Sequence, residues 1–394
     1  MTIHRAFMAL AALLVVACTQ PTASSASPPQ QQPAGWDDQL RMVEAKDANP
    51  DPNIFETTLV AQVANIEILP GRSTPVWTYN GVFPGPVIHV GQGQRLIVHL
   101  VNQLPEATTI HWHGIRLPNA MDGVPDVGQP AVAPGGSFDY DFTVPDAGTF
   151  WYHPHVRSAA QVGFGLYGAM LVTGREEPAE LGDELIVLLS DMSINDDGSL
   201  TSPDAGGDFA TLFGREGNVL LVNGKVNPVL RARAGARQRW RVINAAGARY
   251  YQVELAGQRF TRIGGDGGFL EHPEQVANIL LPPAERADVV FDLALNHDSE
   301  LPVRWVAYDR GYGSTFERRD ETIFRIQTDA TERLTPAALP TLNRTIEAID
   351  VSHAVPQSLQ LTWNNQGSKF ALGINGVPGD EAKPIMAAMG DTQL

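Results

Sequence analysis

The sequence of 394 residues contains a single cysteine, Cys18, close to its first residue. One cysteine cannot form a disulfide within the chain. It also lies where an export signal is expected to end, so we expect neither a disulfide nor a useful free thiol in the mature protein. No cysteine follows Cys18, so a metal site with a thiolate ligand is likewise excluded from the rest of the chain.

Positive charge is also scarce. Lys and Arg number 28 against 44 Asp and Glu, which gives a formal net charge of −16. No basic cluster is present, so a nucleic-acid partner is excluded as a working hypothesis. A negative field favours cationic partners such as metal ions, but in most proteins acidity of this kind serves only solubility.

Long hydrophobic runs are absent after the first residues. The apolar run Ala6–Ala17 is too short to span a membrane as a mature helix. It follows His4 and Arg5 and leads directly into Cys18, an arrangement that resembles a bacterial lipoprotein signal. We therefore expect residues 1–18 to be a lipoprotein-type signal peptide and the protein to be exported and periplasmic, with a lipid on Cys18 as its only membrane anchor.

An ordinary signal peptide, cleaved within Thr19–Ser27 and leaving no anchor, is the alternative. The stretch Thr19–Gly35 is rich in Pro, Gln, Ser and Ala, a composition typical of flexible linkers. We expect residues 19–50 as a whole to form a flexible tether.

Helical periodicity is missing as well, whereas Gly (37) and Pro (29) are frequent. From about Phe55 onward, short runs alternate apolar and polar residues between turn residues, as in Gln94–Val101 and Gln238–Ile243. Alternation with a period of two predicts half-buried antiparallel strands. The sequence therefore predicts an all-β protein of sandwich or barrel type.

An internal repeat divides the chain. Asn80-Gly81 and Asn223-Gly224 are each followed by a Pro, a Gly and, nine residues after that Gly, an Asn. A third copy begins at Asn375-Gly376, and its last Asn would fall beyond residue 394. Three copies indicate homologous domains. We expect domains at 51–175 and 176–330, followed at 331–394 by a linker and the incomplete start of a third.

Two pairs of histidines are the candidate metal ligands of the chain. His111-Trp-His113 and His153-Pro-His155 each place two imidazoles on one face of a strand, because residues i and i+2 of a strand point the same way. Neutral imidazole is a good ligand for copper and zinc. Two neighbouring strands of this kind would direct four ring nitrogens to one point, so the pattern predicts a metal site.

The remaining histidines do not form such His-x-His pairs. We interpret five of them as surface or structural residues, namely His89, His99, His272, His297 and His353, and we assign His4 to the signal. Pro154 donates no ladder hydrogen bond, which predicts that the second pair lies at a strand end or edge, open to a ligand.

These motifs resemble those of the multicopper oxidases, the family of laccases and copper-resistance oxidases. The matching stretches include Asn80–Pro86, His111–Gly114, Asp122–Pro125 and Gly148–His155, with the weaker Gly265–Gly268 and Pro282–Asp288. The resemblance implies tandem cupredoxin-like Greek-key β-sandwiches, three in the common form, and oxidation of a small substrate coupled to reduction of O2 to water.

The resemblance also assigns roles to residues. It implies that His111 binds a type 2 copper, that His113, His153 and His155 bind a type 3 copper pair, and that Asp122 assists proton delivery to this trinuclear cluster. Trp112, Trp151 and Tyr152 are expected to pack the core around the site.

In the family, the third domain supplies four further histidines of the cluster and the type 1 copper site. Those motifs are absent from the 394 residues, so we expect the chain to be truncated before them and inactive alone, with apolar surface exposed. A complete enzyme would oxidise a phenolic substrate or a metal ion. The alternative is a non-enzymatic copper-binding or structural lipoprotein, whereas a copper nitrite reductase fits poorly because it needs a Cys-His copper site.

Overall fold

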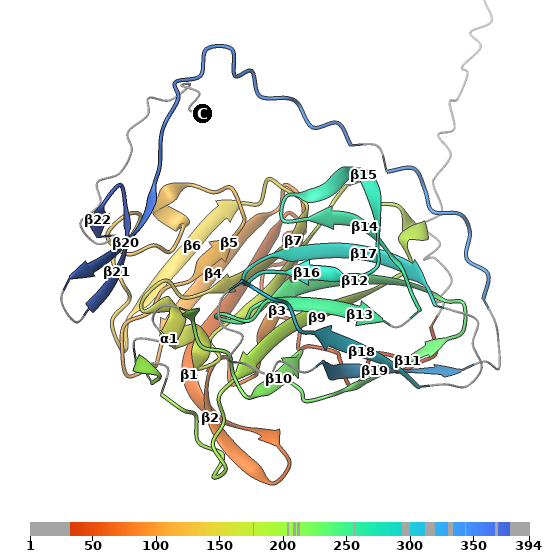
Figure 1. Cartoon of the computed structure of the whole chain (residues 1–394), viewed down its shortest axis with the longest axis horizontal. Helices are drawn as coiled ribbons and strands as arrows, with labels where there is room; N and C mark the ends of the chain where they lie inside the picture. Colours follow the sequence, from red (N-terminus) through yellow and green to blue (C-terminus); the bar gives the residue numbers. More distant parts are fainter. Residues whose placement is uncertain are drawn as a thin grey trace, which may run out of the picture.

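Strands dominate the computed structural model, which describes residues 32–378 except 176, 203–204, 208–209, 211–212, 256, 294–299, 312–319, 330–333, 343 and 367–368. The expected signal at 1–18, the start of the expected tether and residues 379–394 lie outside the described residues. The named helical elements are short: α1 (Ser158–Gly163), η1 (Asn119–Met121) and η2 (Ala179–Leu181). The prediction of an all-β protein is confirmed (Figure 1).

The first unit of the molecule comprises two four-stranded sheets. One has the order β2-β1-β4-β6, with bounds Arg72–Tyr79, Ile54–Leu69, Arg95–Asn102 and Ser137–Thr143. The other has the order β3-β8-β7-β5, with bounds Gly85–Gly91, Gly168–Thr173, Gly148–His153 and His111–His113.

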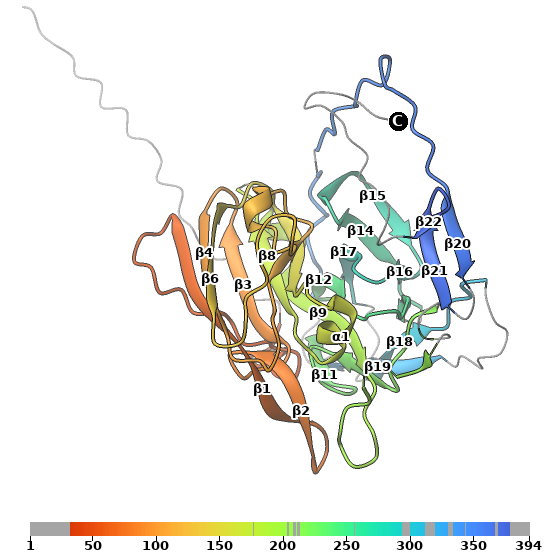
Figure 2. The ribbon, with the colours of Figure 1, turned by 90° about the vertical axis from the view of Figure 1, so that its left-hand side faces the viewer.

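The second unit contains two larger sheets and lies beside the first (Figure 2). The six-stranded sheet β10-β9-β12-β17-β14-β15 spans Val219–Val222, Asp183–Met192, Arg237–Asn244, Arg286–Asp292, Phe260–Gly265 and Gly268–Val276. The five-stranded sheet β11-β19-β18-β13-β16 spans Val229–Arg233, Glu321–Asp329, Glu300–Val306, Tyr251–Leu255 and Ile279–Leu281.

Both units share one topology. The pairs β1–β4 and β3–β8 of the first unit are parallel, and so are β9–β12 and β11–β19 of the second. Parallel neighbours need a crossover, so the expectation of purely antiparallel strands was wrong at these four places. The matching crossovers support the interpretation of the two units as copies of one another.

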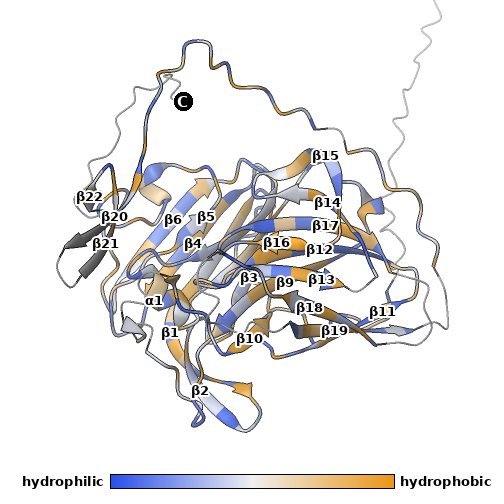
Figure 3. Ribbon diagram, in the orientation of Figure 1, coloured by the Kyte–Doolittle hydropathy of each residue, from blue (hydrophilic) through white to orange (hydrophobic). Residues whose placement is uncertain are grey.

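Each unit has its own apolar core between its sheets. Trp112, Tyr140 and Tyr152 are fully buried in the first core, and Trp240 and Phe260 in the second. Along β1 the buried residues alternate with partly exposed ones, as predicted, and Figure 3 shows apolar and polar residues mixed along the strands of both units.

Strand β12 departs from the predicted half-burial. All of its residues are buried, including the polar positions Arg239 and Arg241. These arginines face an ion cluster that includes Asp288, and Arg239 donates to both oxygens of that carboxylate at 3.1 and 2.7 Å. A strand with alternating apolar and polar residues can therefore be central, because the charged face is covered by opposite charges.

The repeated Asn-Gly pairs adopt one geometry in all three places. Each Asn is left-handed, with φ of 56°, 51° and 54° at Asn80, Asn223 and Asn375. In each place the Asn forms two hydrogen bonds with the backbone of one earlier residue: its N–H donates to that residue's carbonyl, and its side-chain oxygen accepts from that residue's N–H. The partners are Val60 in β1, Leu188 in β9 and Gln360, which directly precedes β20. The third copy of the sequence repeat is therefore also a copy in structure.

That third copy belongs to a small sheet of β20 (Leu361–Gln366), β21 (Lys369–Ile374) and β22 (Val377–Pro378). The described residues between β19 and β20 form no named strand, and Figure 1 shows this segment as a long arc. Positions that are buried in the first two copies are open here: Leu361 is 86% exposed, whereas Ala61 and Leu189 are 0% exposed.

Residues 32–50 differ from the expected flexible tether. Leu40 is buried in the core of the second unit, and its carbonyl accepts a 2.6 Å hydrogen bond from the Asn223 side chain. Farther on, Val87 of β3 exchanges backbone hydrogen bonds with Val43 and Ala45. The expectation was wrong here because apolar residues within this stretch dock against both units.

No helix among the described residues is long and apolar enough to cross a membrane.

We predict that Asn223→Ala lowers the free energy of unfolding by about 3 kcal/mol, because it removes three buried hydrogen bonds and leaves Ala in a left-handed conformation. The side-chain bonds join Asn223 to Leu188 N, Ile186 O and Leu40 O. Urea unfolding would measure the change. Asn375→Ala is the matched control, since the same motif is exposed there, and an equal loss in both variants would contradict the prediction.

Candidate metal centre

The two histidine motifs lie on adjacent strands. β5 and β7 pair antiparallel, with His111 opposite His153 and His113 opposite Trp151. Because opposite residues of an antiparallel pair share a face, His111, His113 and His153 point to the same side of the sheet. β5 is the edge strand and β7 ends at His153, so the predicted position at a strand end or edge is confirmed.

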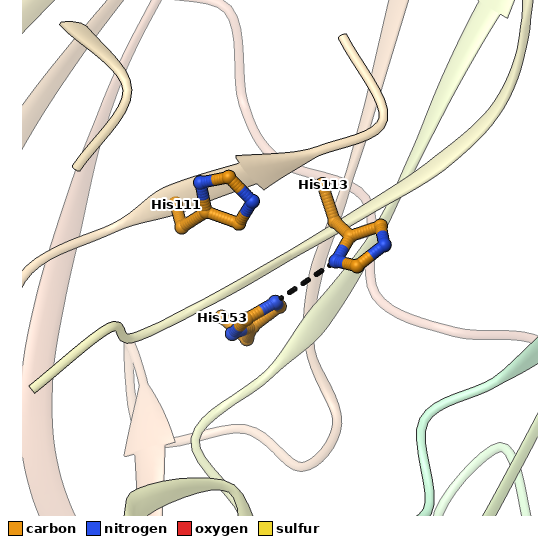
Figure 4. Close-up of side chains that lie close together, drawn as sticks. All are labelled: His111, His113 and His153. Carbon is orange, nitrogen blue, oxygen red and sulfur yellow. Dashed lines mark hydrogen bonds between the residues drawn. The ribbon is translucent and has the colours of Figure 1, made fainter. Parts of the chain in front are cut away.

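Three imidazoles converge on this face (Figure 4). One ring nitrogen each from His111, His113 and His153 lies within 4.8 Å of the others, the only such group found among the described residues. His155 follows the end of β7, and its ring centroid is 5.3 Å from that of His111 and 6.4 Å from that of His153. The structure thus brings three of the four predicted ligands together and places the fourth beside them.

Backbone carbonyls set which nitrogen each ring presents. His111 Nδ1 is 2.7 Å from the carbonyl of Asp122, and His153 Nδ1 is 2.9 Å from the carbonyl of Pro154. A carbonyl only accepts, so Nδ1 carries the proton in both rings and Nε2 keeps its lone pair. This outer hydrogen bond is the usual means by which proteins orient a metal-binding imidazole.

His113 turns its Nδ1 toward His153 Nε2, at 3.2 Å. Two nitrogen ligands of one tetrahedral metal ion, each about 2.0 Å from it, are about 3.3 Å apart. The spacing therefore fits a single ion held between these two rings, and the imidazole donor set suits copper.

Burial keeps two of the rings neutral. Burial is the main cause that lowers the pKa of His113 to about 4, with smaller contributions from the Arg286 guanidinium and from the rings of His111 and His155. Burial is likewise the main cause that lowers the pKa of His153 to about 3. A neutral imidazole has a free lone pair, so at neutral pH no proton competes with a cation for these nitrogens.

Aromatic residues pack around the cluster as expected. Trp151 stacks on His113 with ring centroids 5.2 Å apart, and it lies 4.3 Å from His153. Trp112 and Tyr152 are in the core behind the strands. Trp151 therefore packs on the same face as the imidazoles, whereas Trp112 and Tyr152 anchor the other face of the β5–β7 ribbon in the core.

Asp122 contacts the cluster mainly through its backbone. Its carbonyl orients His111, while its partly exposed carboxylate oxygen lies 3.3 Å from the same Nδ1. Gly123 makes this approach possible, because its φ is +76° and a Cβ there would lie 1.9 Å from the carbonyl oxygen of Ile110. Sequence reasoning had singled out the Asp122 side chain and missed the role of the carbonyl.

The other four histidines that the structure describes are not part of the cluster. His89 bonds to Thr173, and His272 and His353 are exposed. His99 on β4 lies between two carboxylates, with Nδ1 2.8 Å from Asp139 and Nε2 3.0 Å from Glu56. His297 lies outside the described residues.

We predict that His99 makes stability depend on pH. Hydrogen bonds to Glu56 and Asp139 raise the pKa of His99 above 6.5. The stabilisation is therefore complete below about pH 6.5 and is lost as the pH rises through the raised pKa. Unfolding of the native chain and of His99→Gln between pH 5.5 and 9 would test this, and a stability difference that stays constant or grows with pH would contradict it.

We predict that Gly123→Ala lowers the free energy of unfolding more than Gly135→Ala does. Both glycines have nearly the same φ, +76° and +78°, but a Cβ at Gly135 meets nothing within 4 Å. Gly135→Ala therefore measures the conformational cost alone, about 1–2 kcal/mol, and the larger loss in Gly123→Ala reports the clash beneath His111. Equal losses in urea unfolding would show that the close approach is unimportant.

Known proteins with this sequence pattern are copper enzymes. Residues 60–177 and 183–300 each match a family model described as multicopper oxidase. The multicopper oxidase MmcO of Mycobacterium tuberculosis is 32% identical over 96% of this chain and 78% of its own length. The multicopper oxidase mco of Staphylococcus aureus is 32% identical over 63% of this chain and 56% of its own length.

Solved structures agree. The McoA multicopper oxidase of Aquifex aeolicus matches with a TM-score of 0.72 at 26% identity. The match covers 86% of this chain and 74% of the McoA chain. A metallo-oxidase of Campylobacter jejuni has a TM-score of 0.70 at 29% identity, with coverages of 81% and 67%. The sandwiches are therefore cupredoxin-like, and the chain belongs to the multicopper oxidases, a family of copper-dependent oxidoreductases.

Proposed function

We propose that the β5–β7 ribbon is one half of a trinuclear copper site, in a protein that couples one-electron oxidation of a small substrate to the reduction of O2 to water. The observation that carries the proposal is the convergence of three imidazole nitrogens within 4.8 Å of one another. Family membership makes copper the metal, because imidazole alone does not distinguish it from zinc.

Each histidine has a separate task in this proposal. His111 binds the type 2 copper through Nε2, and His113, His153 and His155 bind the type 3 pair. His113 and His153 are neutral at physiological pH, so they bind a cation without first losing a proton. When bound, copper stores and passes single electrons, which is the chemistry that O2 reduction requires.

Asp122 holds His111 in place and is in a position to move protons. Its carbonyl fixes the His111 tautomer, and its carboxylate, about one third exposed, lies 3.3 Å from Nδ1 of the same ring. A carboxylate with one side open to water can take up a proton and release it toward the cluster. The positioning role and the proton role both belong to this one residue.

The reducing substrate is a phenolic compound or a metal ion. The eight methionines are scattered in the sequence and form no methionine-rich insert, which favours an organic substrate. Export to the periplasm, with a lipid anchor at Cys18, would place the protein where copper and O2 are both accessible. A copper-binding protein without oxidase activity is the alternative.

We predict that the 394-residue chain alone binds copper weakly and oxidises no phenol, because the described part of the chain brings only these four histidines to the site. Titration with Cu2+ in competition with a chelator measures the affinity, and a phenol oxidation assay measures turnover. His153→Ala should lose at least the roughly 10–100-fold in affinity that follows loss of an outer-shell partner.

His272→Ala is the matched control, because His272 is exposed on β15. Copper binding that is equal in His153→Ala and His272→Ala would overturn the proposed site. Turnover by the chain alone would overturn the prediction of inactivity, and it would also exclude the alternative function, copper binding without oxidase activity.

A further inference from the structure

Two sequence motifs, Gly265–Gly268 and Pro282–Asp288, have no task in the proposed function, yet the fold brings them together. Asp266 lies in the turn between β14 and β15, and Arg286 is the first residue of β17. The Asp266 carboxylate accepts a 2.7 Å hydrogen bond from the Arg286 backbone N–H and pairs with its Nη1 at 2.9 Å. The turn therefore fixes the start of β17 and the direction of the Arg286 side chain.

The Arg286 side chain reaches from the second unit into the first. Its Nε–H donates to the carbonyl of Thr149 on β7 at 3.0 Å, although the residues are 137 positions apart. Its two terminal nitrogens donate to the carbonyls of Ala284 and Asp266 at 3.1 and 2.9 Å. The residue is only 3% exposed, so these bonds are sheltered from water.

The same guanidinium also lies close to the end of β5. Gly114 follows His113 with φ of +91°, and a Cβ at Gly114 would lie 2.2 Å from Arg286 Nη2. The carbon at the centre of the guanidinium is 5.9 Å from the centre of the Phe150 ring on β7, within cation–π range. One side chain from the second unit thus bonds to β7 and lies close to the residue that follows β5.

A second arginine supports the same residue of β7. Arg241 lies 3.4 Å from the hydroxyl of Thr149 and is held by Glu184 and Glu177 at 2.7 and 3.0 Å. Thr149 is therefore contacted through its carbonyl by Arg286 and through its hydroxyl by Arg241. Both contacts come from the second unit, which has no histidine in the cluster.

We propose that Arg286 is a positioning residue of the metal centre: it locks the β5–β7 ribbon onto the second unit and so holds His113 and His153 in their converging arrangement. It touches neither metal nor substrate and acts through Thr149, Phe150 and Gly114. This role of Arg286 deepens the proposed function. Only its consequence for copper binding rests on that function, whereas the anchoring of the β5–β7 ribbon does not.

The chemistry of arginine suits this task. A guanidinium is planar and has five N–H donors in a fixed fork, so one side chain can satisfy carbonyls from two units simultaneously. Lysine has one nitrogen and cannot span the same acceptors. Loss of Arg286 leaves the buried carbonyl of Thr149 without this donor and opens space beside Phe150, so the ribbon is free to shift.

Hydrogen–deuterium exchange of the metal-free 394-residue chain tests the proposal directly. In Arg286→Gln, the amides of β5 and β7 are expected to exchange about tenfold faster than in the native chain, because their anchor to the second unit is lost. Copper affinity, measured as above, is expected to fall by about 10–100-fold, as for other outer-shell residues.

Arg237→Gln is the matched control. Arg237 is also 3% exposed and also pairs with a carboxylate, Asp292, at 2.7 Å, but it bonds to Asp292 and Glu180, outside the ribbon. Its loss should destabilise the fold without selectively loosening β5 and β7. Unchanged exchange at β5 and β7 in Arg286→Gln, or the same increase in both variants, would overturn the proposal.

If Arg286→Gln does not fold, Asp266→Asn tests in its place whether Arg286 holds the β5–β7 ribbon. Asp266 is half exposed, so the replacement is mild, and it weakens the pairing that directs Arg286. Faster exchange at β5 and β7 supports the proposal and unchanged exchange overturns it. Failure of the native chain to bind copper would contradict the proposed function alone, because the exchange result needs no metal.

Discussion

The antiparallel pairing of β5 with β7 is the interaction on which the metal centre depends. In this register His111 faces His153 and His113 faces Trp151, so three imidazoles share one face of the sheet. A shift of one residue would turn one histidine pair into the core and the buried Trp112 toward the ligand side. The fully buried Trp112 opposes such a shift of β5, because it would have to leave the core.

Around this ribbon, the protein fixes the histidines from three directions. Carbonyls of Asp122 and Pro154 choose the free nitrogen of two rings, Trp151 stacks on the third, and the second unit contacts the far end of β7 through Arg286. A site assembled in this way needs little rearrangement to bind a cation, since its ligands are already neutral and close together. The second unit thus has a structural part in a site to which it gives no ligand.

Much of this could be predicted from the sequence. The period of two gave the strands, because a half-buried strand must alternate, and the paired His-x-His motifs gave the shared face. The Asn-Gly repeat predicted three related elements because a left-handed Asn is needed wherever that turn docks on the preceding strand. Each of these signals arises from neighbours within a few residues.

The remaining features depend on contacts between distant residues. Nothing near Arg286 in the sequence indicates that it bonds to Thr149, 137 positions away, and nothing in the composition of residues 32–50 indicated that Leu40 would complete a core. The alternation in Gln238–Ile243 predicted a half-buried strand, yet acidic residues from other strands cover Arg239 and Arg241. Local patterns specify which face a residue occupies, and only the fold specifies what meets it there.

X-ray absorption spectroscopy at the copper edge of the copper-loaded chain tests the central claim most directly. The account predicts nitrogen scatterers at about 2.0 Å with the multiple scattering of imidazole rings, reduced by His113→Ala and unchanged by His272→Ala. A first shell of oxygen atoms without imidazole scattering, or a spectrum unaffected by His113→Ala, would show that the β5–β7 ribbon does not hold the metal.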